Sequence, residues 1–216
     1  MAKMTRKDLL NAPDEFVTTT STFVKWTKEN PLKLAAITAI VVVLIAGSTG
    51  FYYWKTNRET SSMLAYNAAY NNSQMTLQVI DTYPDTKAGK LSRLRLARLS
   101  YGQNEYSMAV DHAQEFINSW AYEDVFYWEG MLIMAASYMG MGTPDKAIPV
   151  LEECINNAPA NIQDQALFYK AQALIGLSKH DEARQSLLKI SESYQDIAKI
   201  SLAQLEPSPT ETTDAE

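Results

Sequence analysis

The chain carries few residues that could do chemistry, and its two histidines are the first to consider. His112 and Glu115 are three residues apart, a spacing that places both side chains on one face of a helix. Two ligands do not close a metal site, and the second histidine, His180, lies far along the chain. This pair therefore predicts no metal centre.

The other reactive groups also fit structural roles better than catalytic ones. Cys154 is the single cysteine, so it forms no disulfide within the chain, and its place in an apolar helical pattern predicts a buried side chain. The run Gly140-Met141-Gly142-Thr143 lacks the lysine of a phosphate-binding loop and predicts the end of a helix. Glu152 and Glu153 predict a solvated helix face. We expect no catalytic residue, no cofactor and no enzyme activity.

Composition excludes several classes of protein. The chain has 216 residues, of which 46% are hydrophobic and 20% charged, so it can bury a core. Eight glycines leave little material for many tight turns. The net charge of −6 argues against nucleic acid as a partner, because phosphate backbones are bound by basic surfaces.

Residues 34–54 predict a transmembrane helix. The segment contains no charged residue and, as a helix, would be about 31 Å long, the thickness of the hydrocarbon core of a bilayer. An aromatic cluster at residues 51–54 ends it, as is typical where a helix reaches the lipid headgroups. The alternative is a signal peptide cleaved near Ala46-Gly47-Ser48, but the apolar run continues past that point. Ala46 and Gly50 form a small-xxx-small pair that could contact another transmembrane helix.

Basic residues beside this segment predict its orientation. Lys25, Lys28 and Lys33 precede the segment, whereas only Lys55 and Arg58 follow it closely. Because basic residues favour the cytoplasmic side, residues 1–33 are expected to be a cytoplasmic arm. The C-terminal part is then expected on the far side of the membrane, which is the periplasm if this is a single-pass protein of a bacterial inner membrane.

Helical periodicity continues beyond the membrane segment and contains a repeat. Three pairs of alanines have the same internal spacing: Ala97 with Ala109, Ala135 with Ala147 and Ala171 with Ala183. The clearest unit has small and large residues at the positions of a tetratricopeptide repeat (TPR): Met131, Met134, Ala135, Tyr138, Gly142, Ala147, Leu151, Cys154 and Pro159. Small residues at these positions allow two antiparallel helices to approach closely.

The fold class that follows is all-α, with one N-terminal transmembrane helix followed by a TPR-like solenoid of helical hairpins. We expect the TPR-like domain at residues 55–204, with repeats at about 90–123, 128–161 and 164–197. The segment before Pro84 is expected to form a degenerate first hairpin that continues the membrane helix. Residues 205–216 predict a disordered acidic tail.

In this register the first helix of each hairpin would line a protein-binding groove. Its expected exposed residues are Arg95, Arg98, Tyr101, Leu132, Ala136, Met139, Phe168, Gln172 and Ile175. Apolar surfaces that contain methionine adapt to varied peptides, and Arg95 with Arg98 could supply a charged contact. Two alternatives stay open: several of these residues could pack against a neighbouring helix or protomer, and the arginines could pair with local acids.

The anchor, the helix leading out of it, the segment YPDTKAGKLSRLRLARLSY (residues 83–101) and the TPR-like units resemble the YfgM-like ancillary subunits of the bacterial Sec translocon. The resemblance implies a periplasmic TPR domain that associates with the translocon and with a membrane-anchored periplasmic folding factor, and that helps newly exported polypeptides reach chaperones. It supplies no catalytic motif. The alternative function is a scaffold in another envelope assembly, for cell-wall or outer-membrane biogenesis.

Overall fold

The computed structural model describes residues 15–192 and 195–205, and within them it contains helices and no strand. The helices are α2 (Glu15–Glu29), α3 (Pro31–Ala68), α4 (Ser73–Thr82), α5 (Lys87–Gly102), α6 (Tyr106–Ser119), α7 (Val125–Gly140), α8 (Pro144–Asn157), α9 (Ala160–Gly176), α10 (His180–Leu188) and α11 (Gln195–Gln204). The expected all-α class is confirmed. Except for residue 205, the predicted acidic tail lies outside the described residues.

The chain divides into two units, Met1–Asn57 and Arg58–Glu216. Helix α3 is continuous through the boundary, so its first part belongs to one unit and its last part to the other.

In the first unit, a proline separates two helices. Pro31 has no backbone N–H, so it cannot continue the hydrogen bonds of α2, but its restricted φ suits the first position of α3. Asn30 joins the two helices: its backbone N–H and its side-chain amide both donate to the Trp26 carbonyl, at 2.9 and 3.1 Å. Sequence reasoning treated residues 1–33 only as an arm and did not foresee α2.

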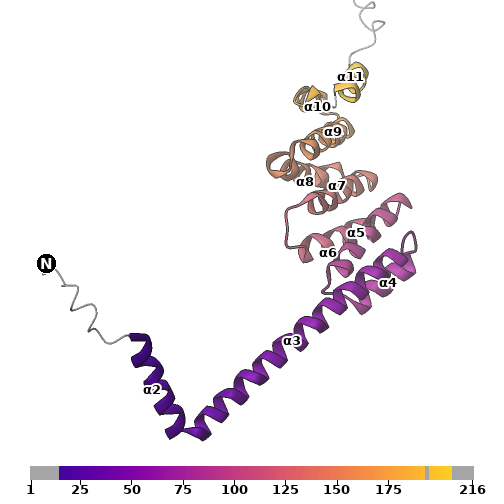
Figure 1. Ribbon diagram of the computed structural model, residues 1–216. Helices are drawn as coiled ribbons and strands as arrows, with labels where there is room; N and C mark the ends of the chain where they lie inside the picture. Colours follow the sequence, from indigo (N-terminus) through magenta and orange to yellow (C-terminus); the bar gives the residue numbers. More distant parts are fainter. Residues whose placement is uncertain (1–14, 193–194, 206–216) are drawn as a thin grey trace, which may run out of the picture. The chain divides into compact units, whose positions relative to one another are not determined.

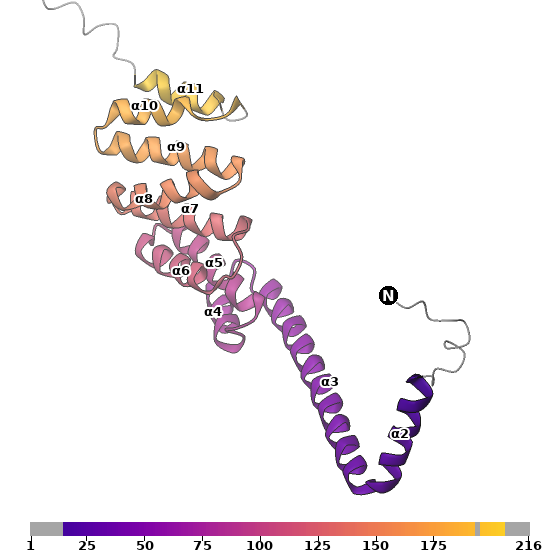
Figure 2. The same cartoon turned by 90° about the vertical axis from the view of Figure 1, so that its left-hand side faces the viewer.

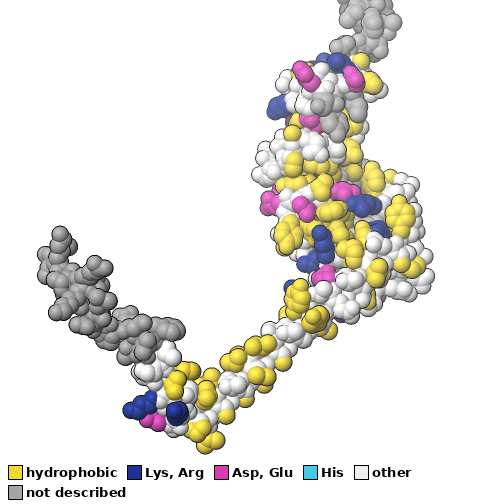
Figure 3. All heavy atoms as spheres, viewed as in Figure 1, with side chains coloured by type: hydrophobic (Ala, Val, Ile, Leu, Met, Phe, Trp, Pro, Cys, Tyr) yellow, Lys and Arg dark blue, Asp and Glu magenta, His cyan; other side chains and the backbone are white. Residues whose placement is uncertain are grey.

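Helix α3 carries the predicted membrane segment. Within the described part of the chain, it is the one helix long and apolar enough to cross a bilayer, and the most apolar stretch of it is unburied. Figure 3 shows apolar side chains along the visible surface of this helix.

In the second unit, the helices pack against their neighbours in chain order from α4 to α11, as Figures 1 and 2 show for α7 to α10. Helix α5 also contacts α7, and α7 also contacts α9. The first helices of three successive hairpins therefore form a row, which is the arrangement expected for a TPR-like solenoid.

The turns of the three hairpins share one backbone conformation. Asn104, Gly142 and Ser178 each have a positive φ, of 61°, 70° and 61° respectively. Each donates its N–H to the carbonyl three residues before it, and the next residue donates to the carbonyl five residues before it. This left-handed position closes the first helix of each hairpin and reverses the chain. Asn71 has a positive φ (56°) between α3 and α4, where a degenerate hairpin was expected.

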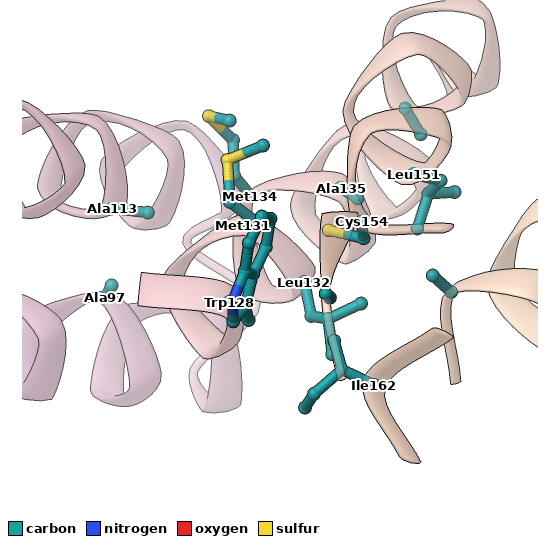
Figure 4. Close-up of a cluster of buried hydrophobic side chains, with 13 residues drawn as sticks. Ala97, Ala113, Trp128, Met131, Leu132, Met134, Ala135, Leu151, Cys154 and Ile162 are labelled. Atoms are coloured by element: carbon teal, nitrogen blue, oxygen red, sulfur yellow. The ribbon is translucent and has the colours of Figure 1, made fainter. Parts of the chain in front are cut away.

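Alanines and a few large side chains build the core of the repeat unit. The three alanine pairs of the sequence repeat are all buried, with exposed fractions of 0% to 1%. Trp128, Met131, Met134, Leu151 and Cys154 fill the space around Ala97, Ala113 and Ala135, as Figure 4 shows. The alanines thus allow neighbouring helices to approach closely, and the large side chains fill the adjacent spaces.

Candidate functional site

Six of the nine expected groove residues are at least partly exposed on the row of first helices. They are Arg98, Tyr101, Met139, Phe168, Gln172 and Ile175, from α5, α7 and α9. We call this set the first-helix face. It offers two aromatic rings, two other apolar side chains and an exposed amide, which are contacts that a polypeptide segment can use.

The other three expected groove residues are buried, so the expectation that they are exposed is wrong. Arg95 turns toward α3: its guanidinium donates to the Tyr66 carbonyl at 2.5 Å and lies 3.5 Å from the centroid of the Tyr66 ring. The arginine therefore helps to join α5 to α3 instead of facing a partner. A carbonyl and an aromatic ring together compensate its burial.

Leu132 and Ala136 belong to the central core cluster, with exposed fractions of 6% and 9%. Helix α7 lies between α5 and α9 in the row and contacts both, so little of its surface remains free. The alternative left open by the sequence, that some of the groove positions pack against a neighbouring helix, therefore holds for Leu132 and Ala136.

Arg98 remains on the first-helix face, but its charge is paired. Its Nε and Nη2 atoms donate to the two carboxylate oxygens of Glu129 on α7, each at 2.5 Å. Burial alone would lower the pKa of Arg98, but the interactions with Glu129 and, to a smaller extent, with Tyr66 together raise it. Of the two interpretations of Arg98, the structure supports pairing with a local acid.

Tyr101 lies at the α5 end of this face, beside two other tyrosines. Burial raises the pKa of Tyr101, and the nearby phenols of Tyr169 and Tyr106 add to the effect. Its ring centroid lies 5.8 Å from that of Tyr106. The Tyr101 hydroxyl is therefore neutral at physiological pH and available as a hydrogen-bond donor.

A pocket of about 300 Å³ lies between α6, α7 and α8, away from the expected groove. Its lining is Gln114, Ile117, Tyr127, Met131, Met134, Pro149, Val150 and Glu153. Burial raises the pKa of Tyr127, and the carboxylate of Glu153 contributes to this. Met131 and Met134 were recognised as packing positions of the repeat, but nothing in the sequence indicated a cavity beside them.

No cluster of three or more histidine, cysteine, aspartate or glutamate side chains that could hold a metal occurs among the described residues. The Nδ1 atom of His112 is buried without a hydrogen-bond partner. Cys154 is fully buried, and this burial raises its pKa to about 12. A neutral, buried thiol is a poor nucleophile, which agrees with a packing role.

In helix α3, a Cβ atom at Gly50 would meet nothing within 4 Å. This side of the helix is thus open in the described structure. The expectation that Ala46 and Gly50 contact another transmembrane helix stays a prediction.

Comparison with known families gives a match in the second unit. A sequence description of the tetratricopeptide repeat matches residues 129–161 and 165–196. Residues 129–161 and 165–196 are therefore TPR units. The two matched segments correspond to the hairpins α7–α8 and α9–α10, whose sequence repeat was the clearest. TPR units mediate interactions between proteins, and this function agrees with the first-helix face. The chain has no significant match among curated proteins or among solved structures.

Proposed function

We propose that this chain is a membrane-anchored TPR adaptor that binds polypeptides close to a bilayer surface. The observation that carries the proposal is the continuity of α3. One helix contains the apolar segment and also Ser62 and Tyr66, which pack in the repeat unit. Anchoring raises the effective concentration of a binding surface near its membrane partners.

The proposed membrane is a bacterial inner membrane, with the N-terminus in the cytoplasm and the TPR unit in the periplasm. The support for the orientation is the excess of lysines before the apolar segment. The support for a bacterial inner membrane is the resemblance to the YfgM-like subunits. Protease added to intact spheroplasts would digest the TPR unit in this orientation. Complete protection, with digestion only after lysis, would overturn it.

The proposed partners are the Sec translocon, a membrane-anchored periplasmic folding factor and newly exported polypeptides. The support for the first two is the resemblance of residues 83–101 and of the anchor-plus-TPR arrangement to the YfgM-like subunits. The proposed role is that of a non-enzymatic adaptor or chaperone-type subunit.

For polypeptides, the proposed binding surface is the first-helix face. Its aromatic and aliphatic side chains are partly exposed, and the charge of Arg98 is already paired with Glu129. Recognition at this surface would therefore depend mainly on apolar contacts, which suits clients of varied sequence.

Site-specific crosslinking in cells tests the partners and the surface together. A photoreactive residue at Ile45 in the apolar segment should give adducts with the translocon channel. Adducts with wall-synthesis or outer-membrane-assembly proteins instead would favour the scaffold function and overturn the proposed one.

A photoreactive residue at Gln172, on the first-helix face, should crosslink to newly exported chains. Gln185 on α10 is the matched control, because it is also an exposed glutamine of the TPR unit but lies outside this face. Equal crosslinking at both sites would show that the face is not the client site.

A further inference from the structure

Helix α2 (Glu15–Glu29) has two unlike faces that no part of the proposed function uses. At about 100° per residue, Trp26 and Thr20 lie within about 60° of Phe23, whereas Ser21, Lys25 and Lys28 lie about 140° to 160° away. Phe23 is 59% exposed, and its ring stacks with that of Trp26 at a centroid distance of 6.4 Å. The helix thus presents two aromatic rings on one side and two lysines on the other.

The position of α2 in the chain indicates what covers this apolar face. Asn30 is the one residue between α2 and α3, and the uncharged segment of α3 begins at residue 34. The four residues between them, 30–33, span at most about 14 Å. If α3 crosses the bilayer, the end of α2 must therefore lie near the membrane surface. Its exposed lysines are then close to lipid phosphates.

We propose that α2 is an interfacial helix that lies in the headgroup layer of an anionic phospholipid bilayer. Phe23 and Trp26 insert toward the acyl chains, and Lys25 and Lys28 face the phosphate groups and the water. Helices with aromatic residues on one face and lysines on the other bind membranes in this way. This inference rests on the proposed function only in that it requires α3 to span the membrane.

Spin labels on the full-length protein in phosphatidylglycerol-containing vesicles test the placement. Nitroxides are attached at T20C and at S21C, which are adjacent in sequence but on opposite sides of the boundary between the two faces. Cys154 can stay, because its burial should prevent labelling, and the unsubstituted chain checks this. We expect the label at residue 20 to be accessible to oxygen and protected from a water-soluble nickel chelate, and the label at residue 21 to show the reverse.

A third label, at V42C in the apolar part of α3, separates the inference from the proposed function. If residue 42 is immersed in lipid while residues 20 and 21 are both accessible to the nickel chelate, the interfacial placement of α2 is wrong, but the membrane-spanning role of α3 is still supported. If residue 42 is also open to the chelate, α3 does not span the bilayer, and both fail. Protection of residue 20 from oxygen and chelate alike would mean that protein covers the face, which also overturns the inference.

Two sets of variants test the assigned side chains. F23S/W26S should abolish the nickel protection at residue 20, and unchanged protection would overturn the role of the aromatic face. K25Q/K28Q should reduce this protection in phosphatidylglycerol-containing vesicles to the level found in pure phosphatidylcholine. Equal protection of the unsubstituted protein in both lipids would overturn the part assigned to the lysines.

Discussion

The first turn of α5 leaves no room for a side chain at residue 89. A Cβ atom there would lie 2.0 Å from the Tyr83 carbonyl oxygen, which is backbone and cannot rotate away. The Gly89 N–H also donates to the hydroxyl of Thr86, the N-cap of the helix, at 3.1 Å. The turn between α4 and α5 therefore depends on a glycine at this position.

We predict that G89A lowers the free energy of unfolding of the TPR unit by about 1 to 3 kcal/mol, the usual cost of overpacking a tightly packed site. G102A is the matched control on the same helix, because its Cβ would meet nothing within 4 Å. Urea unfolding of both variants measures the difference. Equal midpoints would show that the close approach of Tyr83 and Gly89 is not maintained in solution.

Cys154 should be unreactive while the protein is folded. With its pKa raised from 9.0 to about 12, its thiolate fraction near pH 8 falls about a thousandfold. We predict almost no reaction with a thiol reagent such as dithionitrobenzoate at pH 8, and reaction of one thiol per chain in denaturant. Rapid labelling of the folded protein would contradict the burial of this side chain.

The same shift in pKa has a consequence for stability. In the unfolded chain the thiol ionises near its ordinary pKa of 9.0, whereas in the folded protein it stays neutral until about 12. The contribution of Cys154 is therefore complete below about pH 9 and is lost as the pH rises toward 12. C154A lacks this titration, so its free energy of unfolding should fall less steeply over that range.

Single residues differ in how well the sequence predicts them. The burial of Cys154 follows from its place in the repeat pattern. The role of Gly89 is not predictable in this way, because its constraint comes from the carbonyl of Tyr83 in a preceding turn. Arg95 is a similar case, since the Tyr66 carbonyl that receives it lies on another helix.

At the scale of helices, the crossing of α7 and α8 depends on small residues. Ala135 and Ala147 are both fully buried, and α7 and α8 contact each other directly. We predict that A147L overpacks this crossing and lowers stability by about 1 to 3 kcal/mol. A160L is the matched control, because Ala160 is exposed at the start of α9. A melting temperature of A147L equal to that of the control would count against this packing.

The repeat was predictable because it recurs along the chain, whereas the binding surface was only partly so. Asn104, Gly142 and Ser178 occupy equivalent turns, yet only one of them is the glycine that marks such a turn in sequence. Leu132 and Ala136 were expected on a groove, but contacts of α7 with both α5 and α9 bury them. A pattern within one hairpin identifies the inward face of a helix but does not reveal how neighbouring hairpins cover the rest.

At the scale of the whole molecule, the proposal depends on whether α3 remains in the bilayer. Nine large apolar residues of the segment each favour insertion by about 0.3 to 0.6 kcal/mol, or about 3 to 5 kcal/mol together. An arginine at the centre of a membrane helix costs about 2.5 to 3.5 kcal/mol. Two arginines should therefore cancel the insertion energy of α3.

We predict that V42R/L44R releases the chain from membranes under alkaline carbonate extraction, whereas the unsubstituted chain stays in the membrane pellet. V42L/L44V keeps the segment apolar and is the matched control, which should also stay in the pellet. Release of the control or of the unsubstituted chain would mean that α3 is not a stable anchor. The TPR unit would then reach its partners by diffusion, and the concentration of a polypeptide-binding face at the membrane, which is the physical basis of the adaptor function, would be lost.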